Sequence, residues 1–260
     1  MDGLSIVLTV GVIVFITHAL EGITGFGCTV LALPFVAMLL GIKEAVPVLV
    51  VLAWLLAGYI VLTSWKNIVW KEYLYIVVCV GLGLPIGILA FENLKPEYLK
   101  VLLAVFMIAV GSNGLYRMRR TVKANDTAQQ NVPRRKSFTM TSVLFLGGMI
   151  HGAFASGGPF VVIYASKALP DKSLFRVSLC LLWLTLNTIL MIQYTVSGVW
   201  TRSIGLTLLA TLPFFVAGMF LGDYLHHRFN DFYFRLSVYG VLSASGLVML
   251  FDSVRFFMST

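Results

Sequence analysis

The sequence predicts an all-α polytopic membrane protein made of two inverted repeats. Three observations predict this fold: an apolar composition, apolar blocks about as long as a bilayer is thick, and a motif that occurs on both sides of a basic linker. Of the 260 residues, 59% are hydrophobic and 12% are charged, and the mean hydropathy is +0.92. A soluble domain has roughly 45–50% apolar and about 25% charged residues. A water-soluble core of this size cannot absorb so much apolar surface.

Long apolar blocks recur along the chain. A helix needs about 20 residues to cross roughly 30 Å of hydrocarbon, and each block approaches that length. The blocks comprise residues 4–20, 45–63, 76–91, 98–115, 174–194, 204–221 and 236–251. Asp2 precedes the first block, which lacks a basic flank and a small-residue cleavage site, so we expect the block to belong to the mature protein.

The net charge of +8 comes from basic residues that gather in loops and not on one exposed helical face. This distribution is typical of the positive-inside bias of membrane proteins and does not favour nucleic-acid binding. Residues 118–137 are predicted to be a basic cytoplasmic linker between a first transmembrane repeat, residues 1–117, and a second, residues 138–260. Arg176 falls among the basic residues on the cytoplasmic side, and both termini are expected outside.

A weak internal repeat spans this linker. His-Ala-Leu-Glu-Gly-Ile-Thr-Gly at residues 18–25 aligns with His-Gly-Ala-Phe-Ala-Ser-Gly-Gly at residues 151–158. The same order continues with the aligned pairs Trp54 and Trp183, and Pro85 and Pro213. Chance would rarely preserve this order, so we expect a duplicated transmembrane unit.

In each half the glycine motif divides an apolar stretch, residues 4–41 and 138–169, that hardly accommodates two full spans. We expect a pair of short helices there, forming either a re-entrant hairpin or two short crossings, followed by three ordinary transmembrane helices. Either choice gives an odd number of crossings per half and therefore inverted repeats. Such repeats with broken helices indicate a secondary transporter whose site lies near the midplane.

The helix breaks are predicted to form an anion site. Half-helices that begin at residues 24–27 and 156–159 would present free N–H groups and a positive dipole end, and Pro159 suits a first helical turn. The predicted substrate-binding residues are Thr24, Gly25, Phe26, Gly27, Ser156, Gly157, Gly158, His18, His151 and Asn187. The alternative for the glycines is close helix packing.

Three ionisable residues near the breaks are proton-coupling candidates. His18 and His151 can change charge near neutral pH, and Glu21 is a carboxylate inside an apolar segment. The alternatives are neutral histidines bonded to neighbouring helices, and a Glu21 that pairs with His18 or caps a broken helix. Trp54 and Trp183 would wall a pocket or pack in the core. A solvated interfacial cluster is expected from Asp223, His226, His227 and Arg228.

No cofactor or metal site is expected, because the three cysteines lie in apolar stretches without metal-ligand spacing. The sequence also does not predict an enzyme, since it holds no nucleophile-base-acid set and no nucleotide loop. The expected partners are a small anionic substrate and the lipid bilayer. A homo-oligomer is left open.

Three segments resemble the sulfite exporter TauE/SafE family of permeases. They are HALEGITGFGCTVLALP at residues 18–34, GGMIHGAFASGGPFVVIY at 147–164 and FNDFYFRLSVYGVL at 229–242, and the resemblance covers nearly the whole chain. It implies secondary transport of sulfite or an organosulfonate such as sulfoacetate across the bacterial inner (cytoplasmic) membrane. A carrier of non-sulfur organic anions and an anion channel are the alternatives. A scaffold protein is the other class, and the coupling could be to protons, to sodium or absent.

Overall fold

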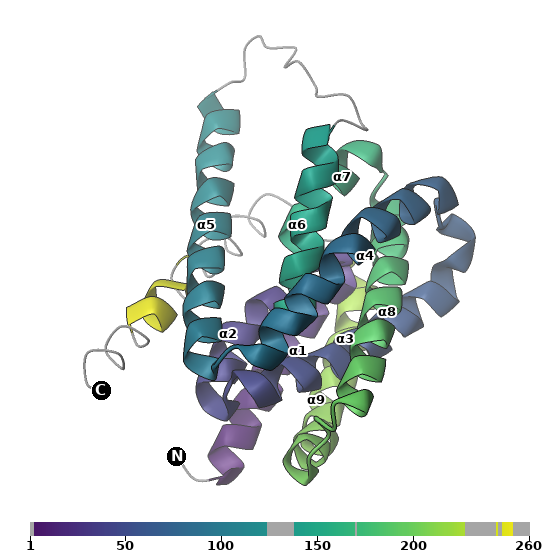
Figure 1. Ribbon diagram of the computed structural model, residues 1–260. Coiled ribbons are helices and arrows are strands. Elements are labelled where there is room, and N and C mark those ends of the chain that lie inside the picture. The colour runs from purple at the N-terminus through teal and green to yellow at the C-terminus, as the bar shows by residue number, and fades with distance from the viewer. Residues whose placement is uncertain (1–2, 124–137, 170, 227–242, 244–245, 252–260) are drawn as a thin grey trace.

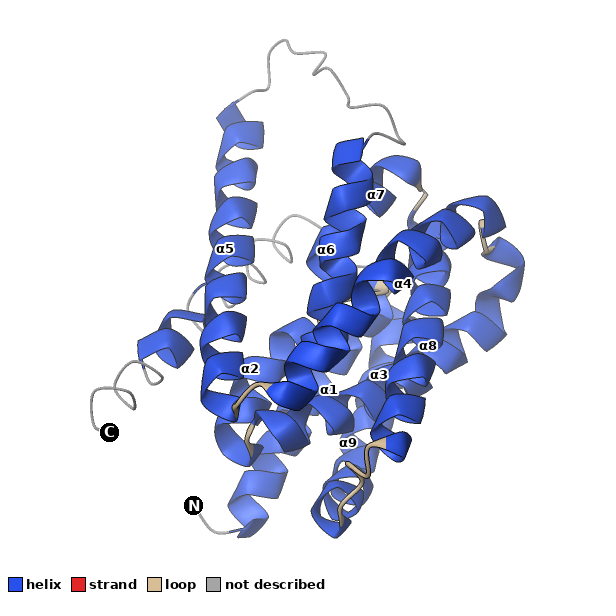
Figure 2. Cartoon of the chain, viewed as in Figure 1, coloured by secondary structure: helices blue, strands red, loops and turns tan. Residues whose placement is uncertain are grey.

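The computed structural model describes residues 3–123, 138–169, 171–226, 243 and 246–251 (Figure 1). Every regular element in these ranges is helical, which confirms the predicted all-α fold (Figure 2). The elements are α1 (Gly3–Thr24), α2 (Cys28–Leu40), α3 (Ile42–Ser64), the short 3-10 helix η1 (Trp65–Asn67), α4 (Trp70–Asn93), α5 (Pro96–Lys123), α6 (Phe138–Phe154), α7 (Gly158–Ala168), α8 (Lys172–Val196) and α9 (Arg202–Leu225).

Six helices in the described part of the chain are long and apolar enough to cross a bilayer. The candidate spans are Ser5–Thr24, Ile42–Asn67, Trp70–Asn93, Pro96–Tyr116, Lys172–Val196 and Arg202–Leu225. The helices α2 and α6 are apolar but shorter. The protein is therefore a multi-pass membrane protein, as predicted.

The outer faces of the spanning helices are apolar. On α4 the exposed side chains of Leu74, Val78, Leu82 and Ile86 recur every four residues and so form one stripe along the helix. Such a stripe would drive association in water, whereas in a bilayer it contacts lipid chains.

Glycines bring two pairs of helices into close contact. A Cβ added to Gly148 or Gly152 of α6 would clash with the carbonyl oxygens of Val80 and Leu84 of α4. The residue numbers rise together along both helices, so α6 and α4 run parallel. Because lipid supplies no hydrophobic force between helices, small residues that permit close backbone packing stabilise such pairs.

The same kind of packing joins α1 to α9. A Cβ on Gly218 would meet the carbonyl oxygen of Phe15, and one on Gly222 would meet that of Ala19. Residue numbers again rise together along the two helices. The glycines at positions 148 and 152, and at 218 and 222, are each separated by three residues, which places both members on one helix face.

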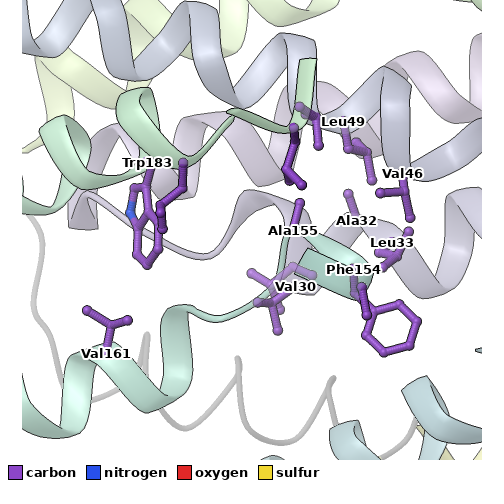
Figure 3. Packing of buried hydrophobic residues seen from close by; sticks show 14 of the residues in the cluster. Val30, Ala32, Leu33, Val46, Leu49, Phe154, Ala155, Val161 and Trp183 are labelled. Carbon is purple, nitrogen blue, oxygen red and sulfur yellow. The ribbon is translucent and has the colours of Figure 1, made fainter. Parts of the chain in front are cut away.

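The centre of the molecule is the antiparallel pair α3 and α8. Trp54 Nε1 donates to Thr188 Oγ1 at 2.8 Å, and the Val69 N–H, just beyond η1, donates to Ser178 Oγ at 3.1 Å. The core cluster draws on this pair and on α2, α6 and α7, part of which Figure 3 shows. The pair therefore forms the support on which the two broken helices rest.

Both predicted breaks are present. The first separates α1 from α2 at residues 25–27, and the second separates α6 from α7 at residues 155–157.

The directions of the helices follow from their side-chain contacts. α4 runs parallel to α8, since Tyr73 bonds Thr185 and Glu92 bonds Gln193. Because α6 is parallel to α4, it is also parallel to α8.

α1 runs in the opposite direction to α6. α9 is parallel to α3, since Ser203 bonds Glu44 and Tyr59 bonds Asp223. α1 is parallel to α9, and α3 is antiparallel to α8. The two broken pairs therefore enter the molecule from opposite ends: α1 begins at the lower end of Figure 1 and α6 at the upper end.

The half after the linker is only partly described. The first half has the three predicted helices after its broken pair, namely α3, α4 and α5, and α5 continues past the expected boundary at residue 117 to Lys123. The second half has α8 and α9, and its predicted third helix falls largely on residues outside the described ranges.

Candidate functional site

The first break is a tight turn that the chain closes with its own groups. Gly25 and Gly27 have φ values of 79° and 109°, which a side chain would strain. The Thr24 hydroxyl lies within hydrogen-bond distance of two carbonyl oxygens, Leu20 O at 2.9 Å and Phe26 O at 2.8 Å. The Gly25 carbonyl accepts from Trp183 Nε1 of α8 at 2.9 Å. The break is thereby fixed against the central helix pair.

The carboxylate of Glu21 caps α2. Its Oε2 accepts from the backbone N–H of Cys28 at 2.7 Å, and the side chain is buried. An anion is favoured at a helix N-terminus because the N–H groups of the first turn lack partners within the helix and the dipole is positive there. In the first break a side chain of the protein occupies this position.

The second break is packed differently. Ala155 has φ 50°, which is rare for a residue with a side chain, and the Ser156 hydroxyl donates to Phe154 O at 2.9 Å. A Cβ on Gly157 would clash with the carbonyl of Gly147, so glycine permits the turn to close on α6. Pro159 stands in the first turn of α7, as predicted.

A small cavity lies between the two breaks. Its lining comprises Glu21, Gly27, Thr29, Val30, Ala53, His151, Ala155, Gly158, Trp183 and Asn187. Its volume is about 20 Å³, which holds about one water molecule. The two broken pairs and the central helices all contribute to this lining. A larger ligand can enter only when these elements move apart.

His151 is the polar centre of the second half of the lining. It is 2% exposed, and its Nε2 donates to Asn187 Oδ1 at 3.1 Å. Its ring stacks on that of Trp183, with 5.4 Å between centroids. Its Nδ1 has no hydrogen-bond partner. A buried polar atom without a partner is unfavourable, so Nδ1 is available to a ligand.

His18 lies apart from the cavity. Its Nδ1 donates to Val14 O at 2.9 Å within α1, and its ring meets that of Phe215 of α9 edge-on at 5.3 Å. The structure therefore does not bring His18 and His151 together, although they align in the repeat. The reason is that α1 turns this face toward α9.

The other predicted site residues divide into two groups. Gly27, Gly158, His151, Asn187 and the coupling candidate Glu21 line the cavity. The residues that form the breaks without lining the cavity are Thr24, Gly25, Phe26, Ser156 and Gly157. Their hydroxyl groups bond within the breaks, and the Phe26 ring lies against Gly158.

Sequence reasoning missed a partly buried ion pair beside the first break. Arg176 was assigned to the basic cytoplasmic side, but it is 7% exposed, and its Nη2 bonds Asp223 Oδ1 at 2.8 Å. The Cα of Arg176 packs directly on Gly25. A helical spacing could have revealed the position, because Arg176, Cys180, Trp183 and Asn187 fall on one face of α8.

The expected solvated cluster around Asp223 was wrong in part. Asp223 is tied to Arg176 and also accepts from the Tyr59 hydroxyl at 3.2 Å. His226 is 2% exposed, and its Nδ1 donates to Ile23 O at 2.6 Å. These contacts hold α8, α9 and α1 together, so burial here follows from packing around the first break. His227 and Arg228 lie outside the described residues.

Within the described residues, no group of three or more His, Cys, Asp or Glu side chains could hold a metal ion. The three cysteines are buried thiols.

The fold and the cavity define a multi-pass membrane protein with polar groups gathered between two interrupted helices, an arrangement typical of secondary transporters. A family model for the sulfite exporter TauE/SafE family matches residues 10–249, so the chain belongs to that family. Membership suggests a membrane transporter of sulfur anions. Neither the curated proteins nor the solved structures contained a match.

Proposed function

We propose that the protein is a secondary transporter that moves a small sulfur-containing anion, sulfite or an organosulfonate such as sulfoacetate, across the cytoplasmic membrane by alternating access. The cavity between the two helix breaks carries this proposal, because it joins a buried histidine with a free nitrogen to an asparagine and the start of a half-helix. These groups suit an oxyanion more than a cation or an apolar molecule.

The anion would lie between the broken pairs. At the second break, the start of α7 at Gly158 offers backbone N–H and a positive dipole end. Asn187 contributes an amide, and His151 contributes its unpartnered Nδ1, which donates to an anion when the ring is protonated on both nitrogens. Trp183 forms one wall. Glu21 and His151 are the proton-coupling candidates that line this space, whereas His18 packs on α9.

The helix pairing supports two inverted repeats. Exchanging the two halves exchanges α1 with α6, α4 with α9 and α3 with α8. The parallel contact of α1 with α9 then corresponds to that of α6 with α4, and the antiparallel pair of α3 with α8 corresponds to itself. Rocking of the halves about this pair would open the cavity to one side and then to the other.

The small volume of the cavity favours a carrier over a channel. A channel needs a continuous aqueous path, whereas the space between the breaks holds about one water molecule. In a carrier, the halves would move apart to admit the anion. The positive-inside bias orients the linker at residues 118–137 toward the cytoplasm and both termini outside.

The test is a thermal-shift screen of detergent-purified protein, since a ligand that binds only the folded state raises apparent stability. The compounds are sulfite, sulfate, thiosulfate, sulfoacetate, isethionate, taurine and a set of carboxylates. Stabilisation by a sulfur anion supports the proposal. Stabilisation by carboxylates alone would remove the sulfur assignment.

A matched pair of variants connects the screen to the cavity. Asn187→Leu should lose the stabilisation, because it replaces the amide with an apolar group of similar size. Asn93→Leu makes the same change at an exposed position at the end of α4 and should keep it. Counterflow of labelled anion in proteoliposomes then separates a carrier, which shows it, from a channel, which does not.

A further inference from the structure

The first break holds a carboxylate where an anionic substrate would bind. Glu21, near the end of α1, is 3% exposed, and its Oε2 occupies the N–H of Cys28 that opens α2. Gly27 stands just before that N–H with open space beside its Cα, and it lines the cavity together with Glu21. The donor at the start of α2 is therefore taken by an anion of the protein itself.

A second observation indicates a ligand in the same cavity. His151 lines the cavity from α6, is 2% exposed and has a free Nδ1, while its Nε2 is already bonded to Asn187. The cavity thus contains both an occupied anion position and unused hydrogen-bonding capacity. A ligand that uses this capacity must share the space with the Glu21 carboxylate.

We propose that Glu21 couples transport to protons: the substrate anion occupies the cavity only after a proton has neutralised the Glu21 carboxylate, so one proton travels with each anion. This inference rests on the proposed function and names its coupling ion. When the anion enters, one proton adds to a carboxylate oxygen and forms an O–H bond. That bond breaks on the other side of the membrane as the anion leaves.

Electrostatic repulsion explains why Glu21 is protonated before the anion enters the cavity. Two negative charges a few ångströms apart in a cavity with little water repel strongly, because few solvent dipoles screen them. A protonated Glu21 removes the repulsion. It also competes less strongly for the Cys28 N–H, and its O–H becomes a donor that can face the anion. One protonation therefore converts a rival of the substrate into a ligand for it.

Other ionisable groups near Glu21 come from each described element packed around α1. They are His18 on α1, Cys28 on α2, Tyr59 on α3, His151 on α6, Cys180 and Arg176 on α8, Asp223 on α9, and His226 just after α9, which bonds Ile23 O. Asp223 pairs with Arg176 and bonds Tyr59, and His18 donates to its own helix. His18 and His151 each keep one nitrogen without a partner, but only His151 lines the cavity. His151 is therefore the other group that could take the proton there.

The probe is isethionate, whose sulfonate keeps one negative charge across the pH range of the experiment, whereas sulfite itself titrates near neutral pH. Wild-type protein and the variants Glu21→Gln, His151→Gln and Glu72→Gln are reconstituted in liposomes. Labelled isethionate is followed in counterflow and in accumulation driven by an imposed pH gradient. Glu72→Gln is the matched control, because Glu72 is also buried but bonds Tyr164 outside the cavity.

In wild-type protein and Glu72→Gln, the proton gradient should drive isethionate accumulation, and isethionate flux should move protons. In Glu21→Gln, counterflow should persist at a rate lowered by the change in the cavity lining, since exchange of one anion for another needs no net movement of protons. Gradient-driven accumulation should be lost. The proposal is overturned if Glu21→Gln remains coupled, if His151→Gln alone becomes uncoupled, or if wild-type transport moves no protons.

The proposed function fails separately. If wild-type protein shows no isethionate counterflow, sulfonate transport itself is contradicted. Binding provides a second measurement that does not need transport or a fully active variant. The dissociation constant of isethionate for wild-type protein in detergent should rise up to about tenfold per pH unit once Glu21 ionises, since one proton is linked to each anion. An affinity that does not change between acidic and alkaline pH would also overturn the proposal.

Discussion

The two helix breaks occupy matching places in the chain but hold different chemistry. At the first, the Glu21 carboxylate bonds the N–H of Cys28, and Trp183 holds the Gly25 carbonyl. At the second, Phe154 stands where the repeat aligns Glu21, and His151 has a nitrogen without a partner. At the first break the start of α2 is capped by the protein itself, and the unpartnered atoms beside it, His18 Nε2 and Arg176 Nε, do not belong to cavity-lining residues. At the second break the unpartnered nitrogen belongs to His151, which lines the cavity.

This difference separates what the proposed duplication preserves from what it allows to diverge. The scaffold is preserved, since α1 packs on α9 through glycines as α6 packs on α4. The side chains that face the cavity have diverged, because only their geometry, not their identity, is needed to hold the helices. Changes to the scaffold should therefore act alike in both halves, and changes to the cavity should act unequally.

The largest expected effect is on the shared scaffold. Gly148→Val and Gly218→Val should each lower the free energy of unfolding by about 3 kcal/mol or more, because the added side chain meets the backbone of the facing helix. Thermal melting of the detergent-purified protein measures this loss. Gly81→Val is the control, since no atom lies within 4 Å of the added Cβ. A normal melting curve for either scaffold variant would contradict the packing described for that half.

The next effect concerns the ion pair, which lies at the first break. Asp223→Asn should destabilise the protein by about 2 kcal/mol, because it leaves the buried Arg176 without its charged partner. Combining it with Arg176→Gln should recover part of the loss, since the unpaired charge is then gone. Melting temperatures of the single and double variants measure this coupling. Strictly additive losses would show that the pair is not coupled.

The aligned histidines should differ in ligand binding. His151→Gln should weaken isethionate binding about tenfold, because His151 lines the cavity with a free nitrogen. His18→Gln should change it less than about twofold, since that ring packs on Phe215 and does not line the cavity. Titration calorimetry in detergent measures both. Equal losses would mean that the two histidines act together on the anion.

The aligned tryptophans give the smallest contrast. Trp183→Phe removes the hydrogen bond to Gly25 and should reduce stability by about 1 kcal/mol. Trp54→Phe removes an exposed bond to Thr188 and should cost about half as much. Thermal melting compares them. If the Trp54 variant proves the less stable, the first break is not fixed by Trp183.

The fold could be predicted further than the site. Apolar block lengths and the glycine motifs predicted the spans and both breaks, because hydrocarbon thickness and unpaired backbone groups constrain any sequence. The alignment of the repeat could not predict which side chains face the cavity and which face a neighbouring helix. Alignment made His18 and His151 equivalent, but helix packing turned one to α9 and the other to the cavity. The burial of Arg176 could not be predicted for the same reason. Its charge suggested a position in a loop, whereas its burial depends on the contact with Asp223.

The central claim is that an anion binds between the two breaks, and cysteine protection tests it most directly. Cys28, Cys79 and Cys180 are replaced by alanine. A single cysteine is then introduced as Ala53→Cys in the cavity lining or as Lys66→Cys at an exposed position in η1. If the claim is right, isethionate or sulfite should slow maleimide labelling of Ala53→Cys at least about tenfold when it occupies nine-tenths of the sites, and leave that of Lys66→Cys unchanged. An anion that stabilises the protein in the thermal screen but leaves both labelling rates unchanged would contradict it.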